Sequence, residues 1–332
     1  MFCKINKGNR IIKKFNLLYC HDEGYNLQTF LSINSVLKNS ETSIFDIHIL
    51  HENPDTFSSY YEKLKISPKI NEIFLYKFKD INNFFPNIKG KHVSAATYYR
   101  LFIQNYLPDS LNSVIYLDSD VIAIKNVDKI FEKCEREILE SKFTIYVSTE
   151  MVKLNENHDV FKNLELVGTN YFNAGVMFID FKKWKNETSI NNFLHLINLY
   201  KEKIIFWDQD ILNKFFDNKF LKLSNNLNFR VYEPVDYSQL DSEAILLHYS
   251  GNAKPWTIQG GYKRSSQFFL DNYREHYPDK FYFELNKSRL ESTKLLIKLL
   301  LNSDFLSIKY KFTYFRKALE VILKGKNKRD AS

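Results

Sequence analysis

Two carboxylates stand one residue apart at the end of a strongly apolar run in the middle of this chain. The run covers residues 114–117 (VIYL), the triplet Asp118-Ser119-Asp120 follows, and a second apolar run covers residues 121–124 (VIAI). Such β-branched and aromatic runs favour a buried strand, in which an unpaired carboxylate is costly. A divalent cation, in contrast, requires a cluster of oxygen ligands. The triplet therefore predicts metal-assisted chemistry on a phosphorylated substrate at the tip of a strand.

The triplet taken alone also fits two different roles. Aspartates after strands form turns and cap helices. A strand followed by Asp-x-Asp also occurs near the start of phosphatases in which the first aspartate is a nucleophile. The phosphatase class is disfavoured because a long α/β segment with its own Asp22 comes before the triplet.

Strand-like and helix-like segments alternate along most of the chain. The strand-like segments are residues 15–20, 45–50 and 73–78, and the helix-like segments are residues 26–38, 60–65 and 94–105. This alternation predicts an α/β fold with a mostly parallel sheet flanked by helices. Ligands of such sheets bind beyond the carboxyl ends of the strands. We therefore expect Asp22, Asp118 and Asp120 at one edge of the sheet.

Two later segments place polar residues beside apolar ones. Asn173-Ala174-Gly175 is expected to precede a strand, where small residues let the backbone approach a ligand, although an ordinary turn explains Gly175 equally well. Residues 208–210 (DQD) stand ahead of a helical run, and one of them is expected to cap that helix. Three polar residues exceed what a cap requires, so this segment is also a candidate for substrate contacts.

A third segment places a histidine at the end of an apolar strand. His248 is followed by Gly251 and Lys254. A lone histidine is more often structural than a metal ligand, because its ring forms hydrogen bonds in many settings. A glycine that exposes backbone N–H groups and a nearby lysine instead favour a metal-bound diphosphate.

Composition indicates one large soluble domain with a basic appendage. The 332 residues are 44% apolar, and Cys3, Cys20 and Cys134 follow no metal-binding pattern, so reduced thiols are expected. We find no signal peptide and no membrane-crossing span, which predicts a cytoplasmic protein. Residues 287–332 hold 12 basic against four acidic residues and so carry all of the net charge of +8. The remainder is neutral and shows no basic groove for nucleic acid.

This C-terminal tail, residues 287–332, also shows helical amphipathicity. Leucines cover much of residues 290–300, and residues 312–323 place aromatic and aliphatic side chains on one face and charged ones on another. Basic amphipathic helices suit the anionic inner leaflet of a membrane. A helical pair packed on the domain, with a solvated charged face, is the alternative.

Five segments together resemble the glycosyltransferase family 8 enzymes, above all the bacterial lipooligosaccharide α-1,4-galactosyltransferases. The resemblance covers roughly residues 15–275 and rests on CHDEGYN (20–26), TYYRL (97–101), YLDSDV (116–121), YFNAGV (171–176) with WDQDILN (207–213), and HYSGNAKPW (248–256). Each motif alone is weak, but the ordered series is specific. The resemblance implies a GT-A fold for residues 1–286 that uses a UDP-sugar and Mn²⁺, with Mg²⁺ as an alternative ion, and retains the anomeric configuration.

The resemblance also implies roles for individual residues. The metal ligands would be Asp118, Asp120 and His248. Asp22 would bind the uracil and Tyr25 would stack on it, while Gly251 and Lys254 would contact the diphosphate. The residues around the sugar would be Arg100, Asn173, Asp208 and Gln209, and Asp118 would also reach it. Further donor-binding residues would be Cys20, Ser119 and Ala174. Gly24 departs from the asparagine frequent in the family, which puts a ribose or base contact in doubt.

The implied reaction moves a hexose, with galactose favoured over glucose, to a saccharide acceptor such as a lipid-linked glycan. Gln209 beneath the sugar is a poor nucleophile, so front-face attack is favoured and Asp208 is the alternative nucleophile. The family resemblance further implies a peripheral position on the inner face of the cell membrane through the basic tail. A sugar-nucleotide-binding protein without turnover is the alternative of another class.

Overall fold

The computed structural model describes residues 5–6, 10–79, 95–150, 158–231, 235–251, 254–261, 263–278, 289–301, 306 and 311–324. The chain divides into two compact units: residues 1–229 with 244–246, and residues 230–243 with 247–332. The division falls inside two short strands, β11 (Phe229–Arg230) and β12 (Leu246–His248). The extended backbone therefore runs without a break from one unit into the next at both places.

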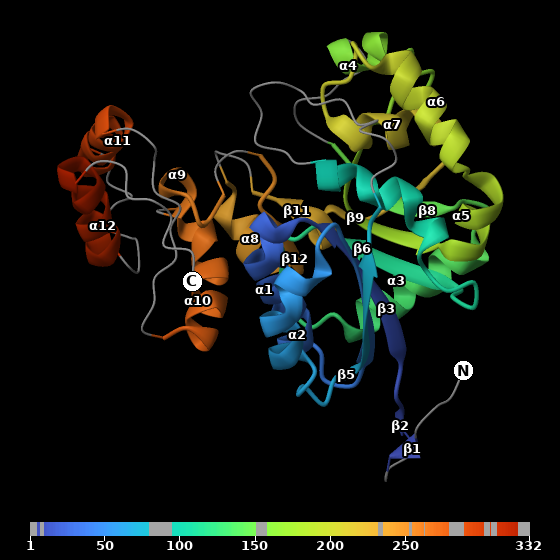
Figure 1. The fold of residues 1–332 in the computed structure, drawn as a ribbon, viewed down its shortest axis with the longest axis horizontal. Helices are drawn as coiled ribbons and strands as arrows, with labels where there is room; N and C mark the ends of the chain where they lie inside the picture. Colours follow the sequence, from blue (N-terminus) through green and yellow to red (C-terminus); the bar gives the residue numbers. More distant parts are fainter. Residues whose placement is uncertain are drawn as a thin grey trace. The chain divides into compact units, whose positions relative to one another are not determined.

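The first unit is built on a seven-stranded sheet in the order β10-β8-β9-β6-β3-β4-β5 (Figure 1). The strands are β3 (Lys14–His21), β4 (Ile44–His51), β5 (Ile70–Lys77), β6 (Ser113–Leu117), β8 (Ile145–Thr149), β9 (Phe172–Asp180) and β10 (Leu221–Lys222). Neighbouring strands are parallel except at β9, which runs antiparallel to both β6 and β8. The predicted α/β fold with a mostly parallel sheet is confirmed.

Both faces of the sheet are covered, which explains why its central strands are mainly apolar. On one face the ring of Phe131, from α3 (Asp128–Glu140), makes edge contacts with Phe15 and Phe178 of the sheet. On the same face the Tyr19 hydroxyl lies 3.1 Å from Ser32 of α1 (Asn26–Lys38). The opposite face carries a large core cluster, in which the sheet packs against η3 (Ala95–Asn105), α5 (Phe181–Glu187), α6 (Ile190–Tyr200) and α7 (Trp207–Phe215).

Most elements predicted from the sequence are present. The helix expected at residues 26–38 has those bounds in the structure, and the strands expected at 15–20 and 45–50 each extend one residue further at both ends. The helix expected at 60–65 is α2 (Ser58–Leu64), and the strand expected at 73–78 is β5. The segment expected at 94–105 is a 3₁₀ helix from Ala95, and residue 94 itself lies outside the described part.

Short elements connect these main ones. In the first unit they are β1 (Ile5–Asn6), β2 (Arg10–Ile11), η1 (Glu23–Tyr25), η2 (Pro54–Phe57), β7 (Val121–Ala123), α4 (Asp159–Asn163) and η4 (Asn225–Asn228). Directly after β7, the N–H of Ile124 donates to the carbonyl of Ile245 at 2.9 Å. Residues 244–246 thereby belong to the first unit.

The second unit is mainly helical. Its helices are α8 (Tyr237–Glu243), α9 (Ile258–Gly261), η5 (Arg264–Ser266), α10 (Gln267–His276), α11 (Arg289–Leu301) and α12 (Lys311–Lys324). α11 and α12 pack against each other and bury Leu296, Ala318 and Val321. The proposed domain boundary at residue 286 lies outside the described residues. No helix among the described residues is long and apolar enough to cross a membrane.

Candidate functional site

The acidic triplet lies where the parallel strands end. β3 and β6 pair in parallel through Leu17 and Ile115, so their carboxyl ends share one edge of the sheet, hereafter the carboxyl edge. β6 ends at Leu117, and the N–H of Asp118 then donates to the carbonyl of Gly175 at 2.8 Å. The triplet thus forms a turn fixed by the backbone of β9 before the chain enters β7.

The three residues of this turn differ in exposure. The side chain of Asp118 is 26% exposed, whereas Asp120 is only 6% exposed. Ser119 is also buried, and its hydroxyl lies 2.8 Å from the hydroxyl of Thr29 on α1. Ser119 therefore ties the turn to the helix behind it, and the two aspartates are left to act at the edge.

Arg100, Asp118 and Asp208 form a buried ion-pair group, hereafter the arginine cluster. The guanidinium of Arg100 is 3.2 Å from Asp118 through Nη1 and 2.7 Å from Asp208 through Nε, and its side chain is 5% exposed. Burial lowers the pKa of Arg100, but the carboxylates of Asp118 and Asp208 together raise it above its ordinary value. One cation therefore serves two carboxylates from different segments.

Tyr116 supports this cluster from within the strand. Its hydroxyl donates to Oδ1 of Asp118 at 2.6 Å, and the guanidinium of Arg100 lies over its ring at 4.5 Å from the centroid. Arg100 also donates from Nη1 to the carbonyl of Ala174 at 2.7 Å and from Nε to the carbonyl of Thr97. Tyr116, which is fully buried, thus fixes the positions of Asp118 and Arg100 at the carboxyl edge.

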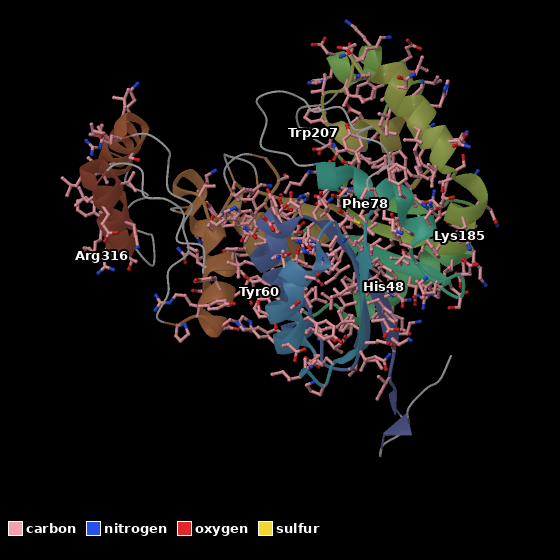
Figure 2. All side chains as sticks on the ribbon, in the orientation of Figure 1. His48, Tyr60, Phe78, Lys185, Trp207 and Arg316 are labelled. Carbon is pink, nitrogen blue, oxygen red and sulfur yellow. The ribbon has the colours of Figure 1, made fainter. Side chains whose placement is uncertain are left out.

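Asp208 is the most unusual acid of the site. Burial raises its pKa to about 7, although Arg100 acts in the opposite direction and Asp118 adds to the rise. Its Oδ2 approaches Arg100 but accepts no aligned hydrogen bond, since the Nε–H points at Thr97. The preceding Trp207, labelled in Figure 2, has a φ of 50°, a left-handed conformation that is costly for a tryptophan. Strain next to Asp208 is typical of a functional position.

Gln209 faces the first residues of β9. Its Oε1 accepts from the N–H of Ala174 and from Nδ2 of Asn173, both at 3.1 Å. The expectation that Asn173-Ala174-Gly175 precede the strand is wrong, because β9 begins at Phe172 and includes them. Since β9 is antiparallel to β6, its first residues nevertheless lie at the carboxyl edge. The strand direction therefore brings Asn173 and Ala174 beside Gln209.

Three residues of this network, Glu150, Asn213 and Asn228, were given no role in the sequence analysis. Asn173 also contacts Glu150 at 3.0 Å and Asn228 at 3.0 Å. Asp210 accepts from the backbone N–H groups of Ile205 and Phe206 at 2.6 and 2.9 Å, just ahead of α7. Asn213 pairs with both backbone groups of Phe172. The partners of Glu150, Asn213 and Asn228 are distant in the sequence, so no local signal indicates these roles. The expectation that residues 208–210 precede the helix and cap it is wrong, because α7 begins at Trp207 and its N-cap residue is Phe206, which provides no side-chain cap.

The residues predicted at the uracil side follow β3. Asp22 caps the short helix η1 by accepting from the N–H of Gly24 at 2.9 Å, and Tyr25 ends that helix half-buried. Burial raises the pKa of the Cys20 thiol, which disfavours a thiolate there. Cys20 interacts electrostatically with Arg100, so β3 brings it to the arginine cluster. Cys20 and Cys134 are free thiols, and Cys3 lies outside the described residues.

A polar group that the sequence analysis missed holds the turn after β3 in place. Oδ1 of Asn26 lies 3.2 Å from Nε2 of His21 and 3.0 Å from Nε2 of His51. Its Nδ2 donates to the carbonyl and hydroxyl of Thr56. Burial lowers the pKa of both histidines, which favours neutral rings. Asn26 thereby joins the ends of β3 and β4 behind Asp22.

The remaining predicted residues belong to the second unit. His248 ends β12, is 3% exposed, and accepts through its carbonyl from the N–H of Val231 at 3.1 Å. Gly251 has a φ of 85°, a conformation that favours glycine, and a Cβ added there would meet no atom within 4 Å. Lys254 donates from Nζ to the carbonyl of Tyr249 at 2.8 Å.

Comparison with known proteins decides among the chemistries open to this site. The family model described as "Glycosyl transferase family 8" matches residues 16–260, which is more than half of the chain. The chain belongs to glycosyltransferase family 8. It is therefore a glycosyltransferase related to lipopolysaccharide galactosyl- and glucosyltransferases.

Two curated relatives match most of this family 8 chain. A lipopolysaccharide 1,3-galactosyltransferase of Salmonella typhimurium is 26% identical, and the match covers 77% of each protein. A lipopolysaccharide 1,2-glucosyltransferase of Escherichia coli is 24% identical, with 76% of each covered. Among solved structures, the galactosyltransferase LgtC in complex with donor and acceptor sugar analogues has a TM-score of 0.63 at 20% identity, covering 77% of this chain and 94% of that one. This likeness confirms the predicted GT-A fold.

Asp118, Asp120 and His248 form a possible metal-binding triad of this family 8 enzyme, in which each residue offers one ligand atom. Two carboxylate oxygens and one imidazole nitrogen suit a divalent cation such as Mn²⁺. His248 stands two residues after Leu246, which belongs to the first unit.

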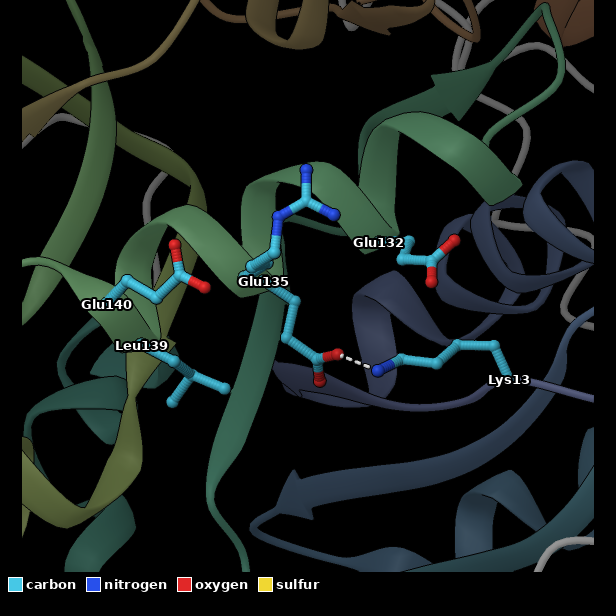
Figure 3. A pocket seen from close by; sticks show the side chains of 6 residues that line it. Lys13, Glu132, Glu135, Leu139 and Glu140 are labelled. Atoms are coloured by element: carbon cyan, nitrogen blue, oxygen red, sulfur yellow. Dashed lines mark ion pairs between the residues drawn. The ribbon is translucent and has the colours of Figure 1, made fainter. Parts of the chain in front are cut away.

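A surface cavity of about 290 Å³ lies elsewhere (Figure 3). It is lined by Lys13, Glu132, Glu135, Arg136, Leu139 and Glu140. Lys13 precedes the first residue of β3 and forms an ion pair with Glu135 at 2.6 Å, so the cavity is at the amino ends of the strands. None of the predicted donor-binding residues lines it, and we exclude it from the candidate active site.

Proposed function

We propose that this family 8 enzyme is a retaining hexosyltransferase that moves galactose from UDP-galactose to a saccharide acceptor with the help of Mn²⁺. The observation that carries the proposal is the arginine cluster, which holds one metal-ligand candidate, Asp118, and one sugar-side candidate, Asp208, on the same guanidinium. In a bound donor the metal-bound diphosphate is adjacent to the sugar. The pairing of Asp118 and Asp208 through Arg100 suits such a ligand, because it places a residue for the metal next to a residue for the sugar.

Individual residues have separate tasks in this proposal. Asp22 and Tyr25 would bind the uracil beside the buried Cys20, on the turn that Asn26 fixes behind them. Gly251 would expose its backbone to the diphosphate, and Lys254 would release the Tyr249 carbonyl to reach the same phosphates.

The metal ligands would be Asp118, Asp120 and His248, with Mg²⁺ as an alternative ion. When bound, the cation would neutralise the negative charge that develops on the UDP leaving group. The chain's own contribution is orientation, since Tyr116 donates to one oxygen of Asp118 at 2.6 Å and Arg100 approaches the same oxygen. Lys254 adds a second cation for the diphosphate.

The positions of Gln209 and Asp208 favour front-face attack. The amide oxygen of Gln209 already accepts two hydrogen bonds from β9, and an amide is a poor nucleophile. Asp208 is paired with Arg100, which suits hydrogen bonding to sugar hydroxyls. In this mechanism the acceptor oxygen attacks the anomeric carbon on the face from which the phosphate oxygen leaves. The leaving phosphate oxygen takes the proton of the acceptor hydroxyl.

The names of the relatives do not decide between galactose and glucose as the transferred sugar. One curated relative is named as a galactosyltransferase and another as a glucosyltransferase, at 26% and 24% identity. The two sugars differ in the orientation of one hydroxyl, which an arginine–carboxylate pair reads only through its detailed position. UDP-glucose is therefore the alternative donor.

The first experiment measures UDP release from a panel of UDP-sugars, with and without Mn²⁺. We expect slow, Mn²⁺-dependent hydrolysis of one sugar, and we expect Asp120→Ala to abolish it because a metal ligand is lost. Asp109→Ala is the matched control, since it removes an aspartate whose side chain is 84% exposed. Release in the presence of chelator at the same rate would contradict the metal-dependent mechanism.

The same panel separates the remaining classes. Mn²⁺-dependent UDP binding without any release, even with saccharide acceptors, would support a sugar-nucleotide-binding protein without turnover. Phosphate release from a phosphomonoester, lost in Asp118→Asn, would support the phosphatase alternative.

We further propose that the acceptor is lipid-linked and that the tail, residues 287–332, binds the anionic inner surface of the cell membrane. The helix pair, α11 and α12, exposes large apolar side chains, including Leu301 (83%), Phe312 (78%) and Leu323 (73%). The tail also carries the whole net charge of the chain. Apolar side chains beside an excess of basic ones suit an anionic lipid surface. We also propose that the acceptor binds to residues from the segments 149–169 and 217–239, of which residues 151–157 and 232–234 lie outside the described part.

Deletion of residues 287–332 tests the membrane proposal. We expect the truncated protein to lose sedimentation with vesicles that contain phosphatidylglycerol while it keeps UDP-sugar hydrolysis. Neutral phosphatidylcholine vesicles are the control for the electrostatic part. Sedimentation of the truncated protein with anionic vesicles would refute the proposal, and loss of hydrolysis as well would indicate that the tail is part of the fold.

A further inference from the structure

Tyr171 lies between two residues of the WDQD segment. It directly precedes β9, is 1% exposed, and its hydroxyl donates to Oδ1 of Asp210 at 2.5 Å. The same hydroxyl accepts from Nε2 of Gln209 at 3.3 Å. The proposed function uses Gln209 beneath the sugar but gives no role to Tyr171 or Asp210.

The hydrogen bonds of Asp210 determine which way the Tyr171 hydroxyl points. Asp210 is fully buried, and its Oδ2 accepts from two backbone N–H groups, those of Ile205 and Phe206. Both carboxylate oxygens of Asp210 therefore act as acceptors, Oδ2 toward the backbone and Oδ1 toward Tyr171. The single proton of the tyrosine hydroxyl is therefore committed to Oδ1, and only the hydroxyl's lone pairs remain for Gln209.

This direction propagates to the amide of Gln209. A hydroxyl that offers lone pairs requires the NH₂ end of the amide, so Oε1 turns to the opposite side. There it accepts from Ala174 N–H and from Asn173 Nδ2, each at 3.1 Å. The order is thus carboxylate, hydroxyl, amide NH₂, in which the hydroxyl donates to the carboxylate and the NH₂ group donates to the hydroxyl.

We propose that Tyr171 is a positioning residue that sets the orientation of the Gln209 amide, with Asp210 fixing the direction of its hydroxyl. This inference rests on the proposed function, because it concerns the residue placed beneath the transferred sugar. Tyr171 does not itself touch the donor. It prevents a flip of the Gln209 side-chain amide, which would place the amide nitrogen where the amide oxygen lies beside the reacting carbon.

Tyr171→Phe removes the hydroxyl and retains the ring. We expect kcat for transfer to fall about tenfold or more, the scale that misplacing a positioned group costs. The KM for the UDP-sugar and the affinity for UDP with Mn²⁺, measured by calorimetry, should stay within about twofold, because uniform binding is not changed. Tyr19→Phe is the matched control, since it removes another fully buried hydroxyl, 3.1 Å from Ser32, on the other face of the sheet.

Asp210→Asn reverses the proposed order while it keeps Tyr171. The two backbone donors would hold the new amide oxygen, so its NH₂ group would face the tyrosine and turn the hydroxyl proton toward Gln209. We expect the same fall in kcat as for Tyr171→Phe, again without loss of UDP affinity. This variant keeps the test decisive if Tyr171→Phe does not fold.

The outcomes separate the inference from the function on which it rests. If the wild type shows no transfer and no release of UDP, the proposed function has failed. If the wild type is active and a folded variant keeps kcat within about twofold of Tyr19→Phe, the positioning role is refuted and the function stands. A parallel loss of UDP affinity and kcat would also refute it, because a general packing defect explains both.

Discussion

At the carboxyl edge of the sheet charged side chains are buried, whereas in the helix pair α11 and α12 large apolar side chains are exposed. Arg100 and Asp208 are 5% and 3% exposed at the edge, and Phe312 and Leu323 are 78% and 73% exposed in the pair. Both arrangements oppose the usual burial preferences of these residue types. At the edge the cost is offset by ion pairing inside the protein, while nothing in the described part of the pair covers Phe312 or Leu323.

The two regions differ in whether their unusual side chains find partners within the protein. The arginine cluster satisfies its charges internally, so it is preorganised for a ligand that fits between them. The helix pair keeps apolar area available, so its energetics depend on what binds there. Substitutions at the edge should therefore change stability strongly, and substitutions on the pair should change association and leave stability almost intact.

The largest effect is expected for Arg100→Ala. It leaves Asp208 buried without its cation, and breaking a buried pair in this way costs about 3–5 kcal/mol in the free energy of unfolding. Urea unfolding measures the loss. Arg264→Ala is the control, because its pair with Asp241 is 51% and 48% exposed and should contribute at most about 1 kcal/mol.

A double substitution sharpens this test. Arg100→Ala combined with Asp208→Asn removes the stranded charge as well as the cation, so part of the lost stability should return. If Arg100→Ala costs no more than Arg264→Ala, the arginine cluster is not more strongly coupled to folding than a surface pair, and the contrast between the two regions fails.

A smaller effect is expected from pH. Burial raises the pKa of Asp208 to about 7, so the folded state holds a proton that the unfolded state has released above the ordinary aspartate pKa of 3.8. Stability from this group is full below the unfolded pKa and is lost as pH rises through about 7. Between pH 5 and 8 the free energy of unfolding should fall by about 2–3 kcal/mol relative to Asp208→Asn. A difference between wild type and variant that does not change with pH would contradict the raised pKa.

The sequence predicts the strands and their carboxyl edge better than the contacts across it. Regular apolar runs indicated β3 and β4, and the bounds of α1 were predicted to the residue, because hydrophobic periodicity is local. The start of β9 was misjudged, since the small residues Asn173 to Gly175 resemble a turn and become a strand only by pairing with distant partners.

The candidate site shows the same limit. The motifs indicated Asp118, Asp208 and Gln209, but not that Arg100 would join the two aspartates. Glu150 stands in no motif, and Tyr171 stands in the YFNAGV segment without a role of its own, because their partners lie 23 and 39 residues away. The strained φ of Trp207 is likewise set by tertiary structure and has no signature in the sequence.

The smallest effect on stability is expected for the double substitution Phe312→Ser and Leu323→Ser on the helix pair. Both side chains are largely exposed, so the free energy of unfolding should change by less than about 0.5 kcal/mol. Each side chain would contribute about 1.5–3 kcal/mol on burial in a lipid interface, so binding to anionic vesicles should weaken by about tenfold or more. Val167→Ser, at a position 93% exposed in the first unit, is the matched control for loss of an exposed apolar side chain.

Equal vesicle binding by the double variant and the wild type would show that the exposed apolar area is not used at the membrane. The basic residues alone would then explain any vesicle binding, and it should disappear at high salt.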